Sequence, residues 1–261
     1  MVKASMVLAS FPMTLDTAEN LGQMLDLLAQ CDAHEVVIFP EGSLSGYSDD
    51  MAFLMEVNLS QVNAGLDRLH RLALEKHLHV FAGAIRQDDQ GWRNQAHYLS
   101  PTGQRAVYNQ ANLATHERGH LVPGESLPAI DVALPGGTLR VGVQLCREIR
   151  FPEQWRALSD TGVKLFIYMT HAINDEPHQP VWRSHLISRA AEHQRWVAAV
   201  NVAHRAQTCP SLVIDPTGLV MREAVSETAG LLRTEIDTSA VSNWYLNQRR
   251  TDLTRALSRE E

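Results

Sequence analysis

Several kinds of segment are missing from this sequence of 261 residues. It has no run of Lys and Arg, and its formal net charge is −7, which argues against a nucleic-acid or anionic-membrane partner. No apolar stretch approaches the roughly 20 residues that span a bilayer. The three cysteines, Cys31, Cys146 and Cys209, are odd in number and far apart, which disfavours a disulfide framework. We therefore expect a cytoplasmic protein whose partner is a small molecule.

Internal repeats and low-complexity linkers are also absent. Hydrophobic residues make up 44% of the chain and charged residues 20%, which is enough apolar material for a sizeable core. We therefore expect a single domain that covers residues 1–261.

Strand and helix patterns alternate along the chain. Amphipathic spacing predicts helices at 17–31, 60–77, 152–161 and 180–193. Pro-Thr-Gly turns at 101–103 and 216–218 predict hairpins, and hence mixed sheets. The class is therefore α/β, with two stacked sheets covered by helices. Short apolar runs predict strands at 6–11, 35–40, 79–85, 96–100, 105–108, 138–146, 164–169, 196–202, 211–215 and 231–237.

Cys146 ends one of these apolar runs, just before the helix start Phe151-Pro152-Glu153. A side chain at such a strand end is presented at the rim of a sheet, and backbone N–H groups of the turn can receive an oxyanion. A free cysteine is also often an inert, buried residue. Position alone leaves both interpretations open.

Two glutamates add to the case for chemistry at Cys146. Glu41 follows the apolar run that ends at Pro40, and Glu117 lies in a loop rich in Gly and Pro. A single loop glutamate is usually only a solvated charge. Strand and loop ends that carry Glu, Glu and Cys are expected to converge on one edge of the same sheet, where sites in α/β folds commonly form.

The blocks around Glu41 and Cys146 resemble those of the carbon-nitrogen hydrolases of the nitrilase superfamily, and the resemblance covers nearly the whole chain. VIFPEGSLSGY is similar to the block of the general-base glutamate, and LCREIRFPEQWRALSDTGVKLFIY to that of the nucleophile. Further matches follow in the family's order: Trp182, Arg189-Ala190-Ala191-Glu192, Asn201, Asp215-Pro216-Thr217-Gly218 and 249–253.

This resemblance implies an α-β-β-α sandwich that forms homodimers. It also implies hydrolysis of an amide or nitrile through a thioester-type intermediate, without metal or cofactor. Cys146 is then the nucleophile, Glu41 the general base and Glu117 a second acid of the site. Amides are the expected substrates because they are the commoner ones in the family.

The sequence departs from the family pattern at two positions. Gln110 stands where the family has a catalytic lysine, and no lysine occurs between Lys76 and Lys164. A glutamine amide donates a hydrogen bond but carries no charge, so an oxyanion gains less from it. Arg147 follows the nucleophile, where an aromatic residue is common. It is a candidate oxyanion or substrate contact, or else it pairs with Glu148 or another acid.

Two alternative functions remain at this stage. A degenerate relative would keep the pocket and bind a small carbonyl compound without turnover. A zinc peptidase is the other, because His116-Glu117-Arg118-Gly119-His120 matches the H-E-x-x-H pattern. That pattern needs both histidines on one helical face, and Gly119 with Pro123-Gly124 argues against a helix here. We therefore expect no metal.

Overall fold

The computed structural model describes residues 1–173 and 179–252, and within them the chain folds into two six-stranded sheets. The first sheet holds, in spatial order, β12 (Gly230–Asp237), β1 (Lys3–Ser10), β2 (Val36–Ile38), β3 (His79–Asp88), β4 (Gly91–Leu99) and β5 (Arg105–Asn109). The second holds β11 (Val220–Ala224), β10 (Ser211–Ile214), β9 (Trp196–Asn201), β8 (Leu165–Thr170), β7 (Gly137–Leu145) and β6 (Ala129–Leu134).

Both sheets are mixed, as the hairpin turns predicted. The central strands β1, β2 and β3 run parallel in the first sheet, and β7, β8 and β9 do so in the second. The outer pairs are antiparallel, for example β3 with β4 and β6 with β7. Each sheet therefore has strands whose carboxyl ends point to the same edge, where loops can carry functional groups.

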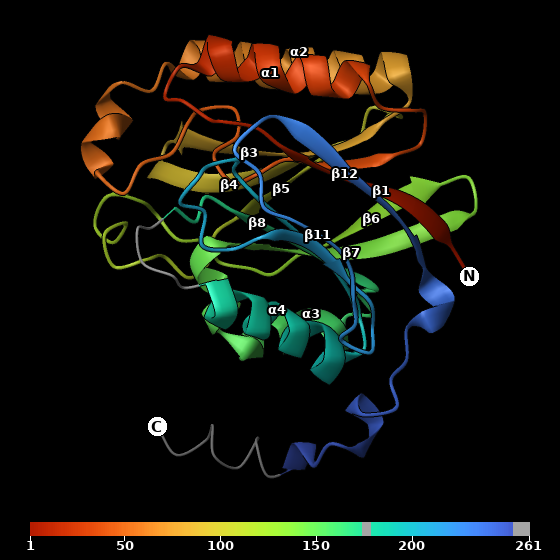
Figure 1. The fold of residues 1–261 in the computed structure, drawn as a ribbon. Coiled ribbons are helices and arrows are strands. Elements are labelled where there is room, and N and C mark those ends of the chain that lie inside the picture. Colours follow the sequence, from red (N-terminus) through yellow and green to blue (C-terminus); the bar gives the residue numbers. More distant parts are fainter. Residues whose placement is uncertain (174–178, 253–261) are drawn as a thin grey trace.

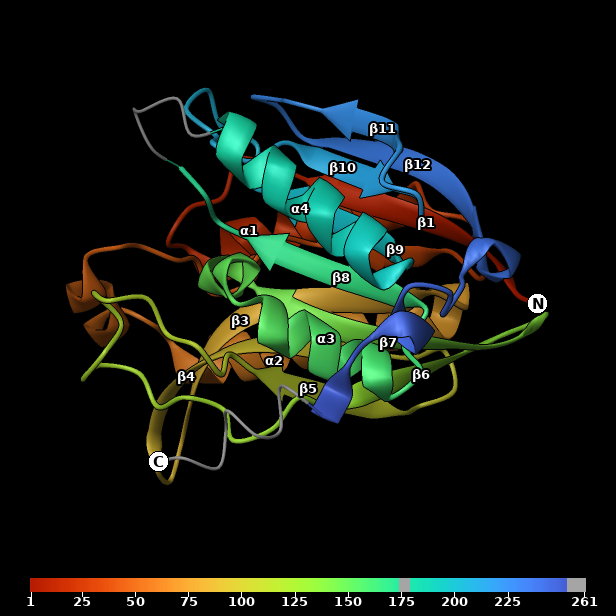
Figure 2. The same cartoon turned by 90° about the horizontal axis from the view of Figure 1, so that it is seen from below.

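Helices cover the outer face of each sheet (Figure 1). The helices α1 (Thr17–Ala29) and α2 (Leu59–Lys76) lie on the first sheet. On the second sheet lie α3 (Pro152–Asp160) and α4 (Gln179–His193), side by side in Figure 2. This order of layers is the predicted α-β-β-α sandwich.

Side chains alternate between the two faces of each strand and so fill three apolar layers. In β1, Met6 and Leu8 belong to the cluster between the sheets, whereas Val7 and Ala9 belong to the cluster under α1 and α2. A third cluster, which includes Trp155, lies between the second sheet and its helices. Since every layer is continuous, the strand ends have little freedom to move relative to one another.

The predicted elements are largely confirmed. All four predicted helices occur, with ends that differ by at most two residues, within the usual uncertainty of helix ends. The strand β6 had not been predicted, because Asp131 interrupts the apolar run of Ala129–Leu134. The 3-10 helix η1 (Met51–Met55) was also missed. Of the family run 249–253, residue 253 lies outside the described residues.

No helix in the described part of the chain combines the length and the apolar character needed to span a membrane.

Candidate active site

The sequence had suggested a site at the edge of one sheet. In the structure, the site lies between the two sheets. Glu41 follows β2 of the first sheet, and Cys146 follows β7 of the second. The backbone N–H of His171, just after β8, donates to Oε2 of Glu41 across the sandwich at 2.8 Å. The expectation of one shared sheet was therefore wrong. Two stacked sheets bring their strand ends together just as closely.

Glu41 is a fully buried carboxyl group with fixed partners. Besides the His171 bond, its Oε1 accepts a hydrogen bond of 2.6 Å from the side chain of Asn94 on β4. The pKa of Glu41 is raised to about 8, first by burial and then by the charge of Glu117. The bonds from His171 and Asn94 and an interaction with the Cys146 thiol act in the opposite direction. Glu41 is therefore largely protonated at neutral pH.

Cys146 begins the 3-10 helix η2 (Cys146–Arg150) with a φ of 37°. This left-handed conformation is costly for a residue other than glycine and is common at functional sites. Its carbonyl accepts a hydrogen bond of 2.7 Å from the hydroxyl of Tyr168 on β8. Burial raises the pKa of the thiol well above its usual value, Glu41 raises it further, and Arg147 lowers it. The thiol therefore needs a base to lose its proton.

Glu117 is a buried side chain of a loop. Its Oε1 accepts a hydrogen bond of 2.8 Å from the Tyr47 hydroxyl, and its Oε2 accepts one of 2.5 Å from the N–H of Ala114. Its charge raises the pKa of both Glu41 and Cys146. The three predicted residues Glu41, Glu117 and Cys146 thus interact with one another.

Gln110 lies next to Glu41, joined to it by one asparagine. The Nδ2 of Asn94 donates both to Oε1 of Glu41 and, at 2.9 Å, to Oε1 of Gln110. The Nε2 of Gln110 donates to the carbonyl of Asn112 at 3.2 Å. Gln110, which the family resemblance places at the lysine position, is therefore a neutral amide that is bonded within the protein.

Pairing of Arg147 with Glu148 was one of the alternatives, and the structure does not show it. The Glu148 carboxylate accepts hydrogen bonds from the N–H groups of Leu145, Ala111 and Asn112 and from the Tyr108 hydroxyl. These bonds tie the segment at Cys146 to the segment after Gln110. Glu148 is an anchor between two loops, and Arg147 is left to face the pocket.

A pocket of about 230 Å³ opens onto Cys146. Its walls come from both sheets and include Tyr47, His171 and Arg147. The ring of His171 lies 5.5 Å from that of Tyr47, and burial lowers the pKa of His171 to about 4, so this ring is neutral at pH 7. The pocket offers space for a small ligand beside the thiol.

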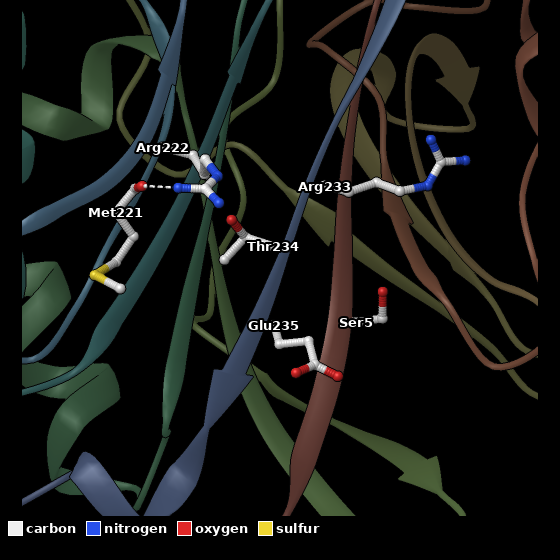
Figure 3. Close-up of a pocket in the computed structure, with 6 residues that line it drawn as sticks. All are labelled: Ser5, Met221, Arg222, Arg233, Thr234 and Glu235. Atoms are coloured by element: carbon white, nitrogen blue, oxygen red, sulfur yellow. Dashed lines mark hydrogen bonds between the residues drawn. The ribbon is translucent and has the colours of Figure 1, made fainter.

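A second pocket, of about 420 Å³, lies at the neighbouring edge strands β11 and β12 (Figure 3). Ser5, Arg233 and Glu235 line it together with residues of β11, and the side chains spread around the two strands without converging. It contains none of the predicted site residues. We therefore assign the chemistry to the smaller pocket at Cys146.

The HERGH segment is not a helix, as its glycine and proline content predicted. Gly119 has a φ of 85°, and the Nε2 of His116 lies 3.0 Å from the Tyr47 hydroxyl and 3.4 Å from Asp49. The described residues contain no group of three or more His, Cys, Asp or Glu that could hold a metal ion. Glu117 points to Tyr47 and the site of Glu41.

Sequence reasoning missed Asn94, Tyr47 and His171. Asn94 is buried in the middle of β4, with no turn or motif to mark it. His171 contributes its backbone N–H to Glu41, which its side chain does not reveal. Tyr47 was part of the block around Glu41, so its position next to the general-base candidate was the available signal.

Comparison with known proteins identifies the family of this chain. The family model for carbon-nitrogen hydrolase matches residues 4–245. The chain belongs to the carbon-nitrogen hydrolase family. It is thus a hydrolase of the amidase and nitrilase type, and the predicted resemblance is confirmed.

Relatives of this carbon-nitrogen hydrolase include two bacterial amidases. An (R)-stereoselective amidase of Pseudomonas sp. is 29% identical over 80% of this chain and 76% of its own length. The 2-oxoglutaramate amidase of Bacillus subtilis is 30% identical over 78% of each chain. Among solved structures, an amidase of Nesterenkonia sp. shares the fold with a TM-score of 0.81 and 24% identity, covering 97% of this chain and 96% of its own.

Proposed function

We propose that this protein hydrolyses small amides, with Cys146 as nucleophile and Glu41 as general base. The observation that supports this most is a pocket of ligand size that Cys146 lines together with His171, whose backbone N–H holds the buried carboxyl group of Glu41. Glu117 acts as a supporting acid and Gln110 takes the place of the family lysine. The amidase relatives favour amides over nitriles. In one variant of the Nesterenkonia enzyme, the acetamide moiety of fluoroacetamide is covalently added to the active-site cysteine, which supports a reactive thiol at the corresponding site.

The reaction proceeds in two stages. Glu41 takes the proton of the Cys146 thiol as the sulfur attacks the amide carbon, and backbone N–H groups of the turn receive the oxyanion. When the carbon–nitrogen bond breaks, Glu41 returns the proton to the departing amine. Water, deprotonated by Glu41, then attacks the thioester and releases the carboxylic acid with the free thiol. No metal or cofactor enters this sequence.

The neutral amide at Gln110 favours a second candidate, a protein that binds a carbonyl compound without turnover. A lost oxyanion donor typically costs about 2.7–4 kcal/mol, or a hundredfold to a thousandfold in rate. Without a cation, Glu41 also keeps its proton up to a higher pH. Both effects slow acylation and leave the binding pocket unchanged.

Release of ammonia from a panel of aliphatic amides tests the proposal. We expect turnover that is abolished in Cys146→Ala and strongly reduced in Glu41→Gln. Circular dichroism of both variants controls for folding. If the wild-type protein binds amides but releases no ammonia between pH 6 and pH 9.5, the binding protein is the correct assignment.

A further inference from the structure

Arg147 lies on the wall of the Cys146 pocket, where it has no hydrogen-bond or ion-pair partner among residues 1–173 and 179–252. Its Nε is buried and has no hydrogen-bond partner, and its guanidinium forms no ion pair with any residue in the described part of the chain. A partly buried guanidinium is expensive to keep unless an acceptor approaches it. Such a group therefore marks a place for a ligand.

The nearby carboxylates are already engaged. Glu148 accepts three backbone N–H groups and a tyrosine hydroxyl. Glu41 accepts bonds from Asn94 and His171, and Glu117 accepts bonds from Tyr47 and Ala114.

Of the described residues that line the pocket, Asp49 carries a carboxylate, which lies 3.4 Å from His116 with 77% of its side chain exposed. In the part of the chain that the structure describes, the acids near Arg147 thus have other neighbours.

Arg150 adds a second positive charge to the same pocket. Its guanidinium lies 5.8 Å from the centre of the Trp182 ring, and its Nη1 is 3.2 Å from Nε2 of His185. Among the described residues it has no ion pair with a carboxylate. Among the described residues, two guanidinium groups and a single carboxylate, that of Asp49, line this pocket, and this excess of positive charge favours an anionic ligand.

We propose that Arg147 forms a subsite for a carboxylate on the acyl part of the substrate. The substrate class is then a small amide that carries a carboxylate, such as the monoamide of a short dicarboxylic acid. A planar guanidinium binds carboxylates in a bidentate manner, and a pocket of about 230 Å³ restricts the ligand to a small one. This inference rests on the proposed amidase function, because it specifies which amides that site accepts.

Succinamate and butyramide form a matched pair for the test. They have the same chain length, and a carboxylate in the first replaces a methyl group in the second. Both release ammonia, so the carboxylate can only belong to the acyl part. We expect Arg147→Gln to lower kcat/KM for succinamate at least tenfold, mainly through KM, and to change butyramide hydrolysis less than about twofold. Arg147→Lys should fall in between, because it keeps the charge and loses the bidentate geometry.

Arg71→Gln is the control, since Arg71 is an exposed arginine of α2 in another layer of the fold. It should leave both substrates unaffected. An equal loss on both substrates through kcat would mean that Arg147 serves the oxyanion, and this result overturns the carboxylate subsite. Unchanged succinamate kinetics in Arg147→Gln overturns it as well.

A binding measurement separates this inference from the proposed function. Calorimetry would compare succinamate binding to Cys146→Ala and to the double variant Cys146→Ala/Arg147→Gln. If the wild-type protein hydrolyses neither amide, the proposed function fails, and the binding result alone decides. An affinity at least tenfold lower in the double variant supports the subsite, whereas equal affinity, or no binding to either variant, overturns it.

Discussion

At the scale of single residues, the proposed function makes the protonation of Glu41 the control of the chemistry at the site. Its carboxyl group is buried and lies near the charge of Glu117, and its pKa is raised to about 8. A general base must be ionised to accept a proton. The fraction of active base therefore increases as the pH rises toward 8 and is small at pH 6.

We accordingly predict that the rate of Cys146 acylation rises about tenfold per pH unit below pH 8 and levels off above it. The measurement is the initial rate of adduct formation from pH 6 to pH 9.5. In Glu41→Gln the rate should be lower, and the inflection near pH 8 should disappear. A wild-type rate that is constant over this range would show that another group takes the proton.

Gln110 offers a second test, because it reaches Glu41 through Asn94. We predict that Gln110→Lys raises acylation at pH 7 about tenfold or more. The added ammonium favours the ionised form of Glu41, so the inflection of the pH profile should also move below 8.

An unchanged or lower rate in a folded Gln110→Lys variant would contradict this prediction. Adding Arg147→Gln to that variant then gives the reason. A further loss of acylation would mean that Arg147 has taken over the role of the lysine, and no further change would mean that the pocket serves another purpose.

At the scale of elements, strand β3 fixes the turn that carries Glu41. Gly83 on β3 accepts a hydrogen bond of 2.9 Å from the N–H of Leu44 and donates one of 2.9 Å to the Ser43 hydroxyl. A Cβ at Gly83 would lie 2.5 Å from the carbonyl oxygen of Pro40 and closer still to the nitrogen of Gly42. Only glycine lets the turn approach the strand this closely.

Gly83→Ala should therefore displace Glu41 from Cys146. We predict at least a tenfold loss of acylation and a decrease of about 1–3 kcal/mol in the free energy of unfolding, as overpacking usually causes. Urea denaturation and the adduct assay measure the two effects. Gly136→Ala is the matched control, since nothing lies within 4 Å of its added Cβ. Equal behaviour of the two variants would show that the turn tolerates a shift.

The elements also show how far sequence reasoning reaches. Glu41 and Cys146 could be named as candidates because each follows an apolar run, and strand ends are visible as a change from apolar residues to Pro, Gly or charge. Asn94 gave no such signal, since its role depends on the register that pairs β4 with β5. The site between two sheets also depends on how the sheets stack, which no local pattern specifies.

At the scale of the whole molecule, the remaining expectation is a homodimer, which the family resemblance implies. Trp244 and Tyr245 near the end of the described chain are 61% and 54% exposed, and exposed aromatic groups are common at contact surfaces. We predict that sedimentation at micromolar concentration gives twice the chain mass of 29.1 kDa. A monomer at all concentrations up to this range would contradict the prediction.

The fold also makes one thiol accessible to reagents and keeps the other two inside. Cys31 and Cys209 are buried, and burial raises the pKa of Cys31 to about 11 and that of Cys209 above its usual value. Cys146 is half-buried and lines a pocket. A covalent adduct on the native protein can therefore be assigned to one residue.

Intact-mass spectrometry during incubation with small amides and activated esters tests the central claim most directly. The account predicts an acyl adduct on Cys146 that forms and then decays as the thioester is hydrolysed, with no adduct in Cys146→Ala. A folded wild-type protein that never gains an acyl group, or one that gains it equally in Cys146→Ala, would contradict the assignment of Cys146 as nucleophile.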